Sequence, residues 1–277
     1  MHTIRDRQSG RLPFVSLGEY VSYVIFFPAL SAGPIDRIER FIADLRKKYD
    51  LTAEDLGEAS KRVMIGLFKK FAIADSLAMI ALNFSNASQV TSTGWAWLLL
   101  YAYAFQIYFD FSGYTDIAIG MGRLLGFKLP ENFNSPFLKP NLTQFWNNWH
   151  ITLTQWFRAY FFNPVTRALR SGKKALPIPV IILITQLATM VLIGLWHGVT
   201  LNFVIWGLWH GLGLFVHNRW SEMTRSRMAT LSSRLQTALN LGGVFLTFNF
   251  IALGWVFFAL PEPTISVHFL RVLFGLA

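Results

Sequence analysis

The sequence has 277 residues, of which 53% are hydrophobic, 16% are aromatic and 14% are charged, and its formal net charge is +10. Because a soluble domain has about 25% charged residues, this composition, together with several long apolar runs, favours a polytopic membrane protein. The chain contains no cysteine, which excludes disulfides and thiolate chemistry.

The first apolar segment, residues 17–33, is short and contains Pro28. A straight membrane crossing needs about 20 apolar residues, so this segment predicts a kinked span or a re-entrant helix. The preceding MHTIRDRQSGRLPF is polar and basic and lacks the features of a cleavable signal or transit peptide. We therefore expect the first apolar segment to serve as the insertion signal.

Two further helical segments are expected before residue 85. Residues 36–62 are charged and predict a soluble helical loop, in which Thr52 and Asp55 have the spacing of a capping box. Residues 63–84 are apolar but are interrupted by three charged residues, Lys69, Lys70 and Asp75. This combination predicts a helix at the membrane interface, with the lysine side chains extending toward the headgroups.

The longest apolar run, residues 94–122, begins with tryptophans, as an interfacial belt would. It contains two acids, Asp110 and Asp116, in the context FDFSGYTD. Small and hydroxyl residues let helices pack closely and satisfy a carboxylate, so a structural role for the two acids is favoured over a proton path. Residues 126–142 are rich in proline and asparagine and predict an irregular loop.

Residues 143–162 predict one amphipathic helix that lies at the membrane or dips into it. Aromatic and apolar side chains recur along one face at helical spacing: Trp146, Trp149, His150, Leu153 and Phe157. Four polar residues lie off that stripe: Gln144, Asn147, Asn148 and Gln155.

The rest of the chain alternates apolar spans with basic loops. Spans are expected, after a basic loop at 165–176, at residues 177–196, 201–217 and 238–260, with a last apolar tail that begins another. Lys and Arg collect in three segments: Arg37–Lys48, Arg158–Lys174 and Arg219–Arg234. The positive-inside rule places such segments in the cytoplasm, and their position among apolar spans favours topology over nucleic-acid binding. The turn at 197–201 is then expected on the other side, which places His197 toward the middle or far side of the bilayer.

Ionisable side chains are costly in a membrane span, so a histidine there indicates function. His197 is bracketed by Gly194 and Gly198, which permit close approach of backbone or ligand. An unperturbed imidazole has a pKa of about 6.5, so His197 and His150 are both candidate general bases. The alternatives are a packing histidine that hydrogen-bonds a neighbouring helix for His197, and an interfacial anchor for His150.

Two more histidines follow in the span after His197. The neighbours of His210, Trp209 and Gly211, are like those of His197, but the sequence has neither an HExxH motif nor a histidine–carboxylate cluster, which disfavours a metal. We interpret His210 as a packing residue and His217 as an interface residue. No GxSxG elbow, P-loop or dinucleotide fingerprint occurs, so the ordinary serine hydrolase, NTPase and dehydrogenase classes have no support.

Five stretches carry a specific resemblance to a known family: FFPALSAGPIDR (26–37), FDFSGYTDIAIGMGRLLGFKLPENFNSPF (109–137), FWNNWHITLTQWFRAYFF (145–162), GLWHGVTLNFVIWGLWHG (194–211) and LGWVFF (253–258). They resemble the membrane-bound O-acyltransferase (MBOAT) family, especially its bacterial branch of alginate O-acetylase and teichoic-acid D-alanyl transferase. The resemblance covers most of the chain from residue 20 onward. Members of this branch continue further at both ends, so we expect a single membrane-embedded acyltransferase-like domain over residues 1–277, as a fragment, a truncated product or a reduced homologue.

The resemblance implies an all-α, polytopic transmembrane helical bundle, with amphipathic or re-entrant helices around a tunnel. It implies transfer of a short, acetyl-like acyl group from a thioester to a hydroxyl of a cell-envelope polysaccharide or a carrier, as in alginate biosynthesis. His197 falls on the invariant histidine of the family and His150 on the second histidine of the branch, which implies a general base and a polarising or orienting group. Supporting or substrate-binding roles are expected for Asn147, Trp149, Trp196, Asn202 and Asp116.

The resemblance also implies the surroundings of the protein. No bound cofactor or metal is expected, and the acyl donor is acetyl-CoA or an acyl carrier protein. The expected partners are membrane lipid, the donor, and an extracytoplasmic acyltransferase or polysaccharide-export proteins, with no nucleic acid, in a multi-pass protein of the bacterial cytoplasmic (inner) membrane. Two alternatives remain open: a non-catalytic, degenerate family member that acts as a membrane scaffold or acyl conduit, and a proton-coupled transporter that uses Asp110 and Asp116.

Overall fold

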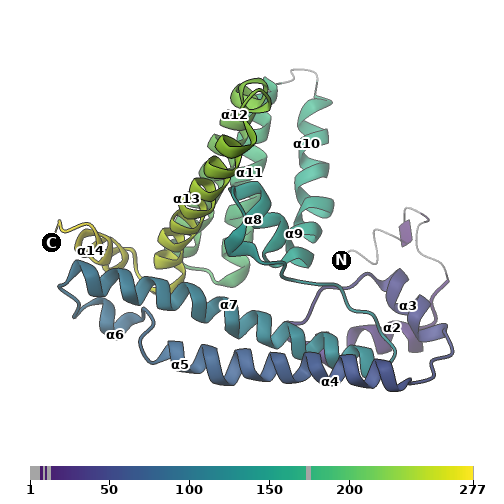
Figure 1. Cartoon of the computed structure of the whole chain (residues 1–277). Coiled ribbons are helices and arrows are strands. Elements are labelled where there is room, and N and C mark those ends of the chain that lie inside the picture. The colour runs from purple at the N-terminus through teal and green to yellow at the C-terminus, as the bar shows by residue number, and fades with distance from the viewer. Residues whose placement is uncertain (1–6, 9, 11–13, 173–175, 277) are drawn as a thin grey trace. The chain divides into compact units, whose positions relative to one another are not determined.

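A computed structural model describes residues 7–8, 10, 14–172 and 176–276. Within these residues the regular structure is helical and contains no extended strand, which confirms the predicted all-α class (Figure 1). Most of the N-terminal MHTIRDRQSGRLPF and the lysines at 173 and 174 lie outside the described residues. The chain forms two compact units: unit 1 comprises Met1–Ser76, Ile107–Phe133 and Ile151–Trp156, and unit 2 comprises Leu77–Gln106, Asn134–His150 and Phe157–Ala277.

Unit 1 begins with short helical elements, as the proline in the first apolar segment predicts. They are α2 (Leu17–Val24), the 3-10 turn η1 (Phe27–Ala29) and α3 (Ile38–Arg46). Ser16 caps α2 through a capping box. Aromatic rings from these elements form a small core, in which Phe41 lies 5.1 Å from Phe26 and 4.6 Å from Phe127 between ring centroids.

The second layer of unit 1 is a close crossing of two long helices. One is α4 (Ala53–Leu67), which Thr52 caps as predicted, continued by the π-helix η2 (Phe68–Ala74) and by α5 (Asp75–Ala78). The other is the second half of α7 (Thr93–Leu124). A Cβ atom on Gly66 would lie 2.6 Å from the carbonyl oxygen of Gly113, so only glycine permits this backbone approach.

In unit 2, the first half of α7 packs against α13 (Ser233–Ala259) and α14 (Pro263–Leu273). The last apolar tail thus forms a helix of its own, and α6 (Phe84–Ala87) closes the same core. Side chains from all four elements are fully enclosed: Ala87, Ala96, Leu100, Ala252, Val256 and Phe269. The end of the described chain is therefore fixed by packing of α14 against residues that are distant in the sequence.

The centre of unit 2 is a hairpin of α11 (Ile178–His197) and α12 (Leu201–Ala229). The predicted turn at 197–201 is confirmed, and it lies at the opposite end of α11 from the start of that helix at Ile178 (Figure 1). In contrast to the predicted end at 217, α12 continues through the charged residues that follow. Within the described residues, two helices, α11 and α13, are long and apolar enough to cross a membrane.

The segment predicted as one amphipathic helix, 143–162, is instead interrupted. It forms α8 (Leu142–Asn148), α9 (Ile151–Phe157) and the π-helix η4 (Arg158–Phe162), followed by α10 (Asn163–Arg170). The preceding loop is irregular as predicted, apart from the 3-10 turn η3 (Pro136–Leu138). Part of the basic loop expected at 165–176 is therefore helical, and the break between α8 and α9 falls at Trp149 and His150.

Candidate active site

His150 occupies a strained backbone position between α8 and α9. Its φ angle is +42°, in the left-handed region that non-glycine residues rarely adopt. Asn141 caps the start of α8 by accepting a hydrogen bond from the Gln144 N–H, and α8 ends at Asn148, before Trp149, whose backbone is extended. The imidazole is therefore presented from a sharp corner of the chain and not from the side of a helix.

The His150 side chain is buried, with 6% of its surface exposed. Burial lowers the pKa of the imidazole well below its ordinary value, and the neighbouring His197 lowers that pKa further. The ring of His150 lies 6.1 Å from that of Trp196 between centroids. Burial and the nearby His197 thus favour the neutral form of the His150 imidazole.

His197 is the last residue of α11 and is surrounded by aromatic rings. Four ring centroids lie within about 6 Å of its own, those of Trp196 at 4.8 Å, Phe258 at 4.8 Å, Trp206 at 5.9 Å and Phe203 at 6.1 Å. The residue as a whole is exposed at the end of the helix. Unit 2 thus brings both predicted histidines to the same indole, Trp196, one on a buried residue and the other on an exposed one.

Glycine packing explains how the hairpin holds His197 in place. A Cβ on Gly194 would lie 2.2 Å from the carbonyl oxygen of Phe203, and one on Gly198 would lie 2.5 Å from the Phe203 ring. The two glycines that flank His197 therefore let α12 approach the end of α11, as their spacing predicts.

The other predicted site residues of unit 2 have different surroundings. Asn147 is exposed and accepts a 2.6 Å hydrogen bond from the Arg158 guanidinium. Trp149 is buried against Trp255, with 5.2 Å between centroids. Asn202 is buried and donates to the Leu260 carbonyl and the Ser266 hydroxyl, so its side-chain amide joins the start of α12 to the link between α13 and α14.

Asp116 belongs to unit 1, where it accepts hydrogen bonds from two cations. The Arg62 Nε lies 2.9 Å from Oδ1 and the Lys69 Nζ lies 2.7 Å from Oδ2. The second acid, Asp110, pairs with Lys70. The lysines predicted to extend toward lipid headgroups instead pair with acids on α7, because the helix crossing places them opposite these carboxylates.

His210 and His217 differ from each other as much as from His197. His210 has 0% exposure and lies between Trp146 at 5.1 Å and Trp206 at 4.7 Å. Both its ring nitrogens lack a hydrogen-bond partner within the described residues. His217 makes a 3.1 Å hydrogen bond through Nδ1 with the Thr143 hydroxyl, so it joins α12 to α8.

Within the described ranges, no group of three or more His, Asp or Glu side chains is placed to hold a metal ion. The groups around Trp196 are imidazoles and aromatic rings, and an imidazole can transfer a proton. Two residues were not singled out by the sequence analysis. Asn132 accepts hydrogen bonds from the backbone N–H groups of Ile151 and Thr152, just after His150, and the Thr152 hydroxyl donates to the Asn132 side chain. Asn132 lies in the 109–137 stretch and Thr152 in the 145–162 stretch, but nothing in the sequence indicated that these two residues contact each other.

Comparison with known proteins shows the family of this chain. Residues 6–260 match the MBOAT, membrane-bound O-acyltransferase family, and the chain belongs to it. The predicted resemblance is thereby confirmed, including the bacterial branch. In this family the chain is membrane-associated, and its histidine corner lies within the matched residues.

Three named relatives show the range of the branch. The chain is 37% identical to peptidoglycan O-acetyltransferase of Helicobacter pylori over 99% of this chain and 52% of the relative. It is 34% identical to the probable alginate O-acetylase AlgI of Pseudomonas aeruginosa, over 94% of this chain and 46% of the relative. It is 32% identical to teichoic acid D-alanyltransferase of Bacillus subtilis, over 86% and 60%. The chain thus spans about half the length of the first two of these relatives.

Proposed function

We propose that this chain carries the reactive centre of a membrane O-acyltransferase. It transfers a short, acetyl-like acyl group from a thioester to a hydroxyl of a cell-envelope polysaccharide or of a carrier. The observation that carries the proposal is that the rings of both histidines lie close to the Trp196 ring, at centroid distances of 6.1 Å for His150 and 4.8 Å for His197. The names of the relatives support the reaction class, since they describe O-acetyl and D-alanyl transfer to envelope polymers.

In the proposed reaction, His197 acts as the general base. Its unprotonated nitrogen takes the proton of the acceptor hydroxyl while the oxygen attacks the carbonyl carbon of the thioester. The exposure of His197 at the end of α11 leaves room for both reactants. When the tetrahedral intermediate collapses, the C–S bond breaks and the imidazolium returns the proton to the leaving sulfur, which yields an ester and a free thiol.

His150 polarises the carbonyl in this scheme. Its buried, neutral ring has an N–H that can hydrogen-bond the oxygen on which negative charge develops. A donor fixed before the reaction stabilises that charge more strongly in apolar surroundings than in water. The aromatic rings around His197, including Trp206 and Phe258, supply such surroundings.

We further propose that the chain is a multi-pass protein of the bacterial inner membrane. The apolar helices α11 and α13 support this, as does the basic segment Arg219–Arg234, which covers the end of α12 and the start of α13, at the end of the hairpin away from His197 (Figure 1). The thioester donor, acetyl-CoA or an acyl carrier protein, then arrives from the cytoplasmic side. A tunnel through a helical bundle connects it with an envelope acceptor and with an extracytoplasmic acyltransferase or export partner.

The test uses the chain in bacterial membrane vesicles supplied with radiolabelled acetyl-CoA or acetylated acyl carrier protein. We expect His197→Ala to lower acetyl transfer to envelope polysaccharide at least about 100-fold, the lower end of the contribution of a general base, and His150→Ala to lower it about as much. His268→Ala is the matched control, since His268 is exposed on α14, and should keep parental activity. Each variant is first checked for expression and membrane insertion.

Full transfer by the His197 variant would overturn the assignment of the base. Absence of transfer by the parent, with an unchanged envelope phenotype in the His197 variant, would favour the non-catalytic scaffold. Inactivation by Asp110→Asn or Asp116→Asn with dispensable histidines would favour a proton-coupled transporter.

A further inference from the structure

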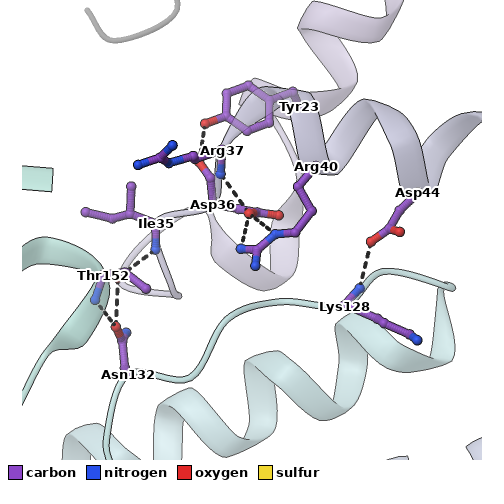
Figure 2. Close-up of polar contacts among 9 residues, drawn as sticks. All are labelled: Tyr23, Ile35, Asp36, Arg37, Arg40, Asp44, Lys128, Asn132 and Thr152. Carbon is purple, nitrogen blue, oxygen red and sulfur yellow. Dashed lines mark hydrogen bonds and ion pairs between the residues drawn. The ribbon is translucent and has the colours of Figure 1, made fainter. Parts of the chain in front are cut away.

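We propose that Asn132 and Thr152 are positioning residues, which hold His150 at the corner between α8 and α9 by diverting the hydrogen bonds that would otherwise join these helices. The inference rests on the function proposed above, because it assigns His150 a reaction that depends on its orientation. Figure 2 shows the contacts of Thr152 with Asn132 and with Ile35.

The starting point is a conflict between local sequence and observed backbone. Apolar residues on both sides of His150 recur at helical spacing, for example Trp146, Trp149 and Leu153, and this pattern favours one continuous helix. The left-handed φ of +42° at His150 is also unfavourable for a residue with a Cβ. The corner therefore persists only if other groups compensate for it.

Those groups are residues of the preceding loop, which replace the backbone hydrogen bonds that a continuous helix would form. In a continuous helix, the N–H of Thr152 would donate to the carbonyl of Asn148, four residues earlier. Instead, the Thr152 N–H donates to Oδ1 of Asn132 at 3.2 Å, and the Asn148 carbonyl accepts from the N–H of Asn134 at 3.1 Å. Both halves of one helical hydrogen bond are thus bound to the loop that contains Asn132 and Asn134.

The neighbouring helical hydrogen bond, from the N–H of Ile151, is replaced in the same way. The N–H of Ile151 donates to the carbonyl oxygen of Asn132 at 3.0 Å and not to the carbonyl of Asn147. Asn132 therefore satisfies the first two N–H groups of α9, one with its backbone and one with its side chain. Because Asn132 is fully buried, water cannot replace it without a large cost.

The Thr152 hydroxyl extends this arrangement. It donates to Oδ1 of Asn132 at 2.7 Å and accepts from the N–H of Ile35 at 3.0 Å. One hydroxyl thus connects α9 with the loop before η3 and with the chain before α3. A hydroxyl is needed here, because valine has the shape of threonine but neither a donor nor an acceptor.

The chain around Ile35 is itself held firmly (Figure 2). The carboxylate of Asp36 accepts from its neighbour, the Arg37 N–H, at 2.7 Å and pairs with the Arg40 guanidinium. The Tyr23 hydroxyl donates to the Asp36 carbonyl at 2.8 Å. Thr152 is therefore anchored to a fixed point of unit 1, and a fixed point is what a positioning role requires.

The kinetic test compares two changes at one position in membrane vesicles with radiolabelled acetyl-CoA. Thr152→Val should lower kcat by about 10- to 100-fold with KM within about twofold, because misplacement of a reacting group by about 1 Å costs up to about 100-fold. Thr152→Ser restores the hydroxyl and should recover at least half of parental kcat. Thr185→Val is the matched control, since Thr185 is equally buried but its hydroxyl bonds only the carbonyls of its own helix.

A second measurement does not depend on activity. The rate of hydrogen–deuterium exchange at imidazole C2, followed by mass spectrometry, reports the surroundings of each histidine in the intact chain. We expect Thr152→Val and Asn132→Ala to raise the exchange rate at His150 at least threefold. Exchange at His210, which is fully enclosed, should not change.

The two measurements separate this inference from the function on which it rests. If exchange at His150 rises but kcat stays parental, the positioning holds and the proposed role of His150 in the reaction is wrong. If kcat falls while exchange at His150 is unchanged, or if Thr152→Ser fails to recover kcat, the positioning is wrong. If vesicles of the parent transfer no acetyl group, the proposed function fails with this donor, and the exchange rates alone decide the positioning.

Discussion

Two buried polar side chains, Asp116 in unit 1 and His210 in unit 2, are accommodated in opposite ways. In unit 1, the crossing of α4 and η2 with α7 pairs its buried acid, Asp116, with the Arg62 and Lys69 cations. In unit 2, His210 is enclosed by aromatic rings, and neither of its ring nitrogens has a partner in the part of the chain that the structure describes. Paired groups of the first kind stabilise a helix crossing, whereas an unpaired polar group costs stability and needs another explanation.

The paired acids of unit 1 and the histidine at the end of α11 therefore have different expected roles. The acids for which the sequence favoured a structural role, Asp110 and Asp116, are those whose charges are matched locally. The apolar helix α11 ends at His197, the residue that we propose as the general base. Three changes test the comparison, and they are given from the largest expected effect to the smallest.

The largest effect is expected from Asp116→Ala. Removal of the carboxylate leaves Arg62 and Lys69 without their shared partner in a closely packed crossing, which should lower the free energy of unfolding by about 2–3 kcal/mol. Asp110→Ala is the control, because its carboxylate is half-exposed and has one cation, Lys70. It should cost less than about 1 kcal/mol. Denaturant unfolding in detergent micelles measures both, and equal losses would show that pairing at Asp116 does not stabilise the crossing.

An intermediate effect is expected from Gly254→Ala in α13. The new Cβ would lie 2.6 Å from Nε2 of His210, so the imidazole must shift within a packed core, at a cost of about 1–2 kcal/mol. The control is Gly242→Ala on the same helix, where a Cβ meets no atom within 4 Å. That change should raise stability by about 0.5–1 kcal/mol through helix propensity. Thermal unfolding of the two variants should therefore shift in opposite directions, and a loss in both would mean that α13 is not packed as described.

The smallest effect is expected from His210→Leu. Since the nitrogens of His210 lack partners in the described ranges, an apolar side chain of similar volume removes polar groups without breaking a hydrogen bond. The free energy of unfolding should change by less than about 1 kcal/mol in either direction. Denaturant unfolding checks this value. A loss as large as that of Asp116→Ala would indicate that His210 is hydrogen-bonded, and the contrast between the units would then disappear.

Much of the fold could be predicted because helix periodicity and apolar length are local properties. The spans that became α7, α11 and α13, the turn after His197 and the cap at Thr52 all follow from neighbouring residues. The pairing of Lys69 with an acid 47 positions away does not, because lysines in an apolar helix suit both a lipid interface and a buried partner. The side chains that decide between them belong to another helix.

The sequence by itself determined the family, the all-α class and the place of His197 at the end of an apolar hairpin, since each depends on motifs or on local pattern. Only the tertiary structure decided the corner at His150. The apolar pattern from 143 to 162 is the same for a continuous helix and for a broken one, and a helix satisfies its own backbone by default. The break exists because Asn132, 20 residues from Thr152, takes the N–H groups that the helix would have used. That competition between local and distant partners depends on which groups folding brings together, which no local pattern specifies.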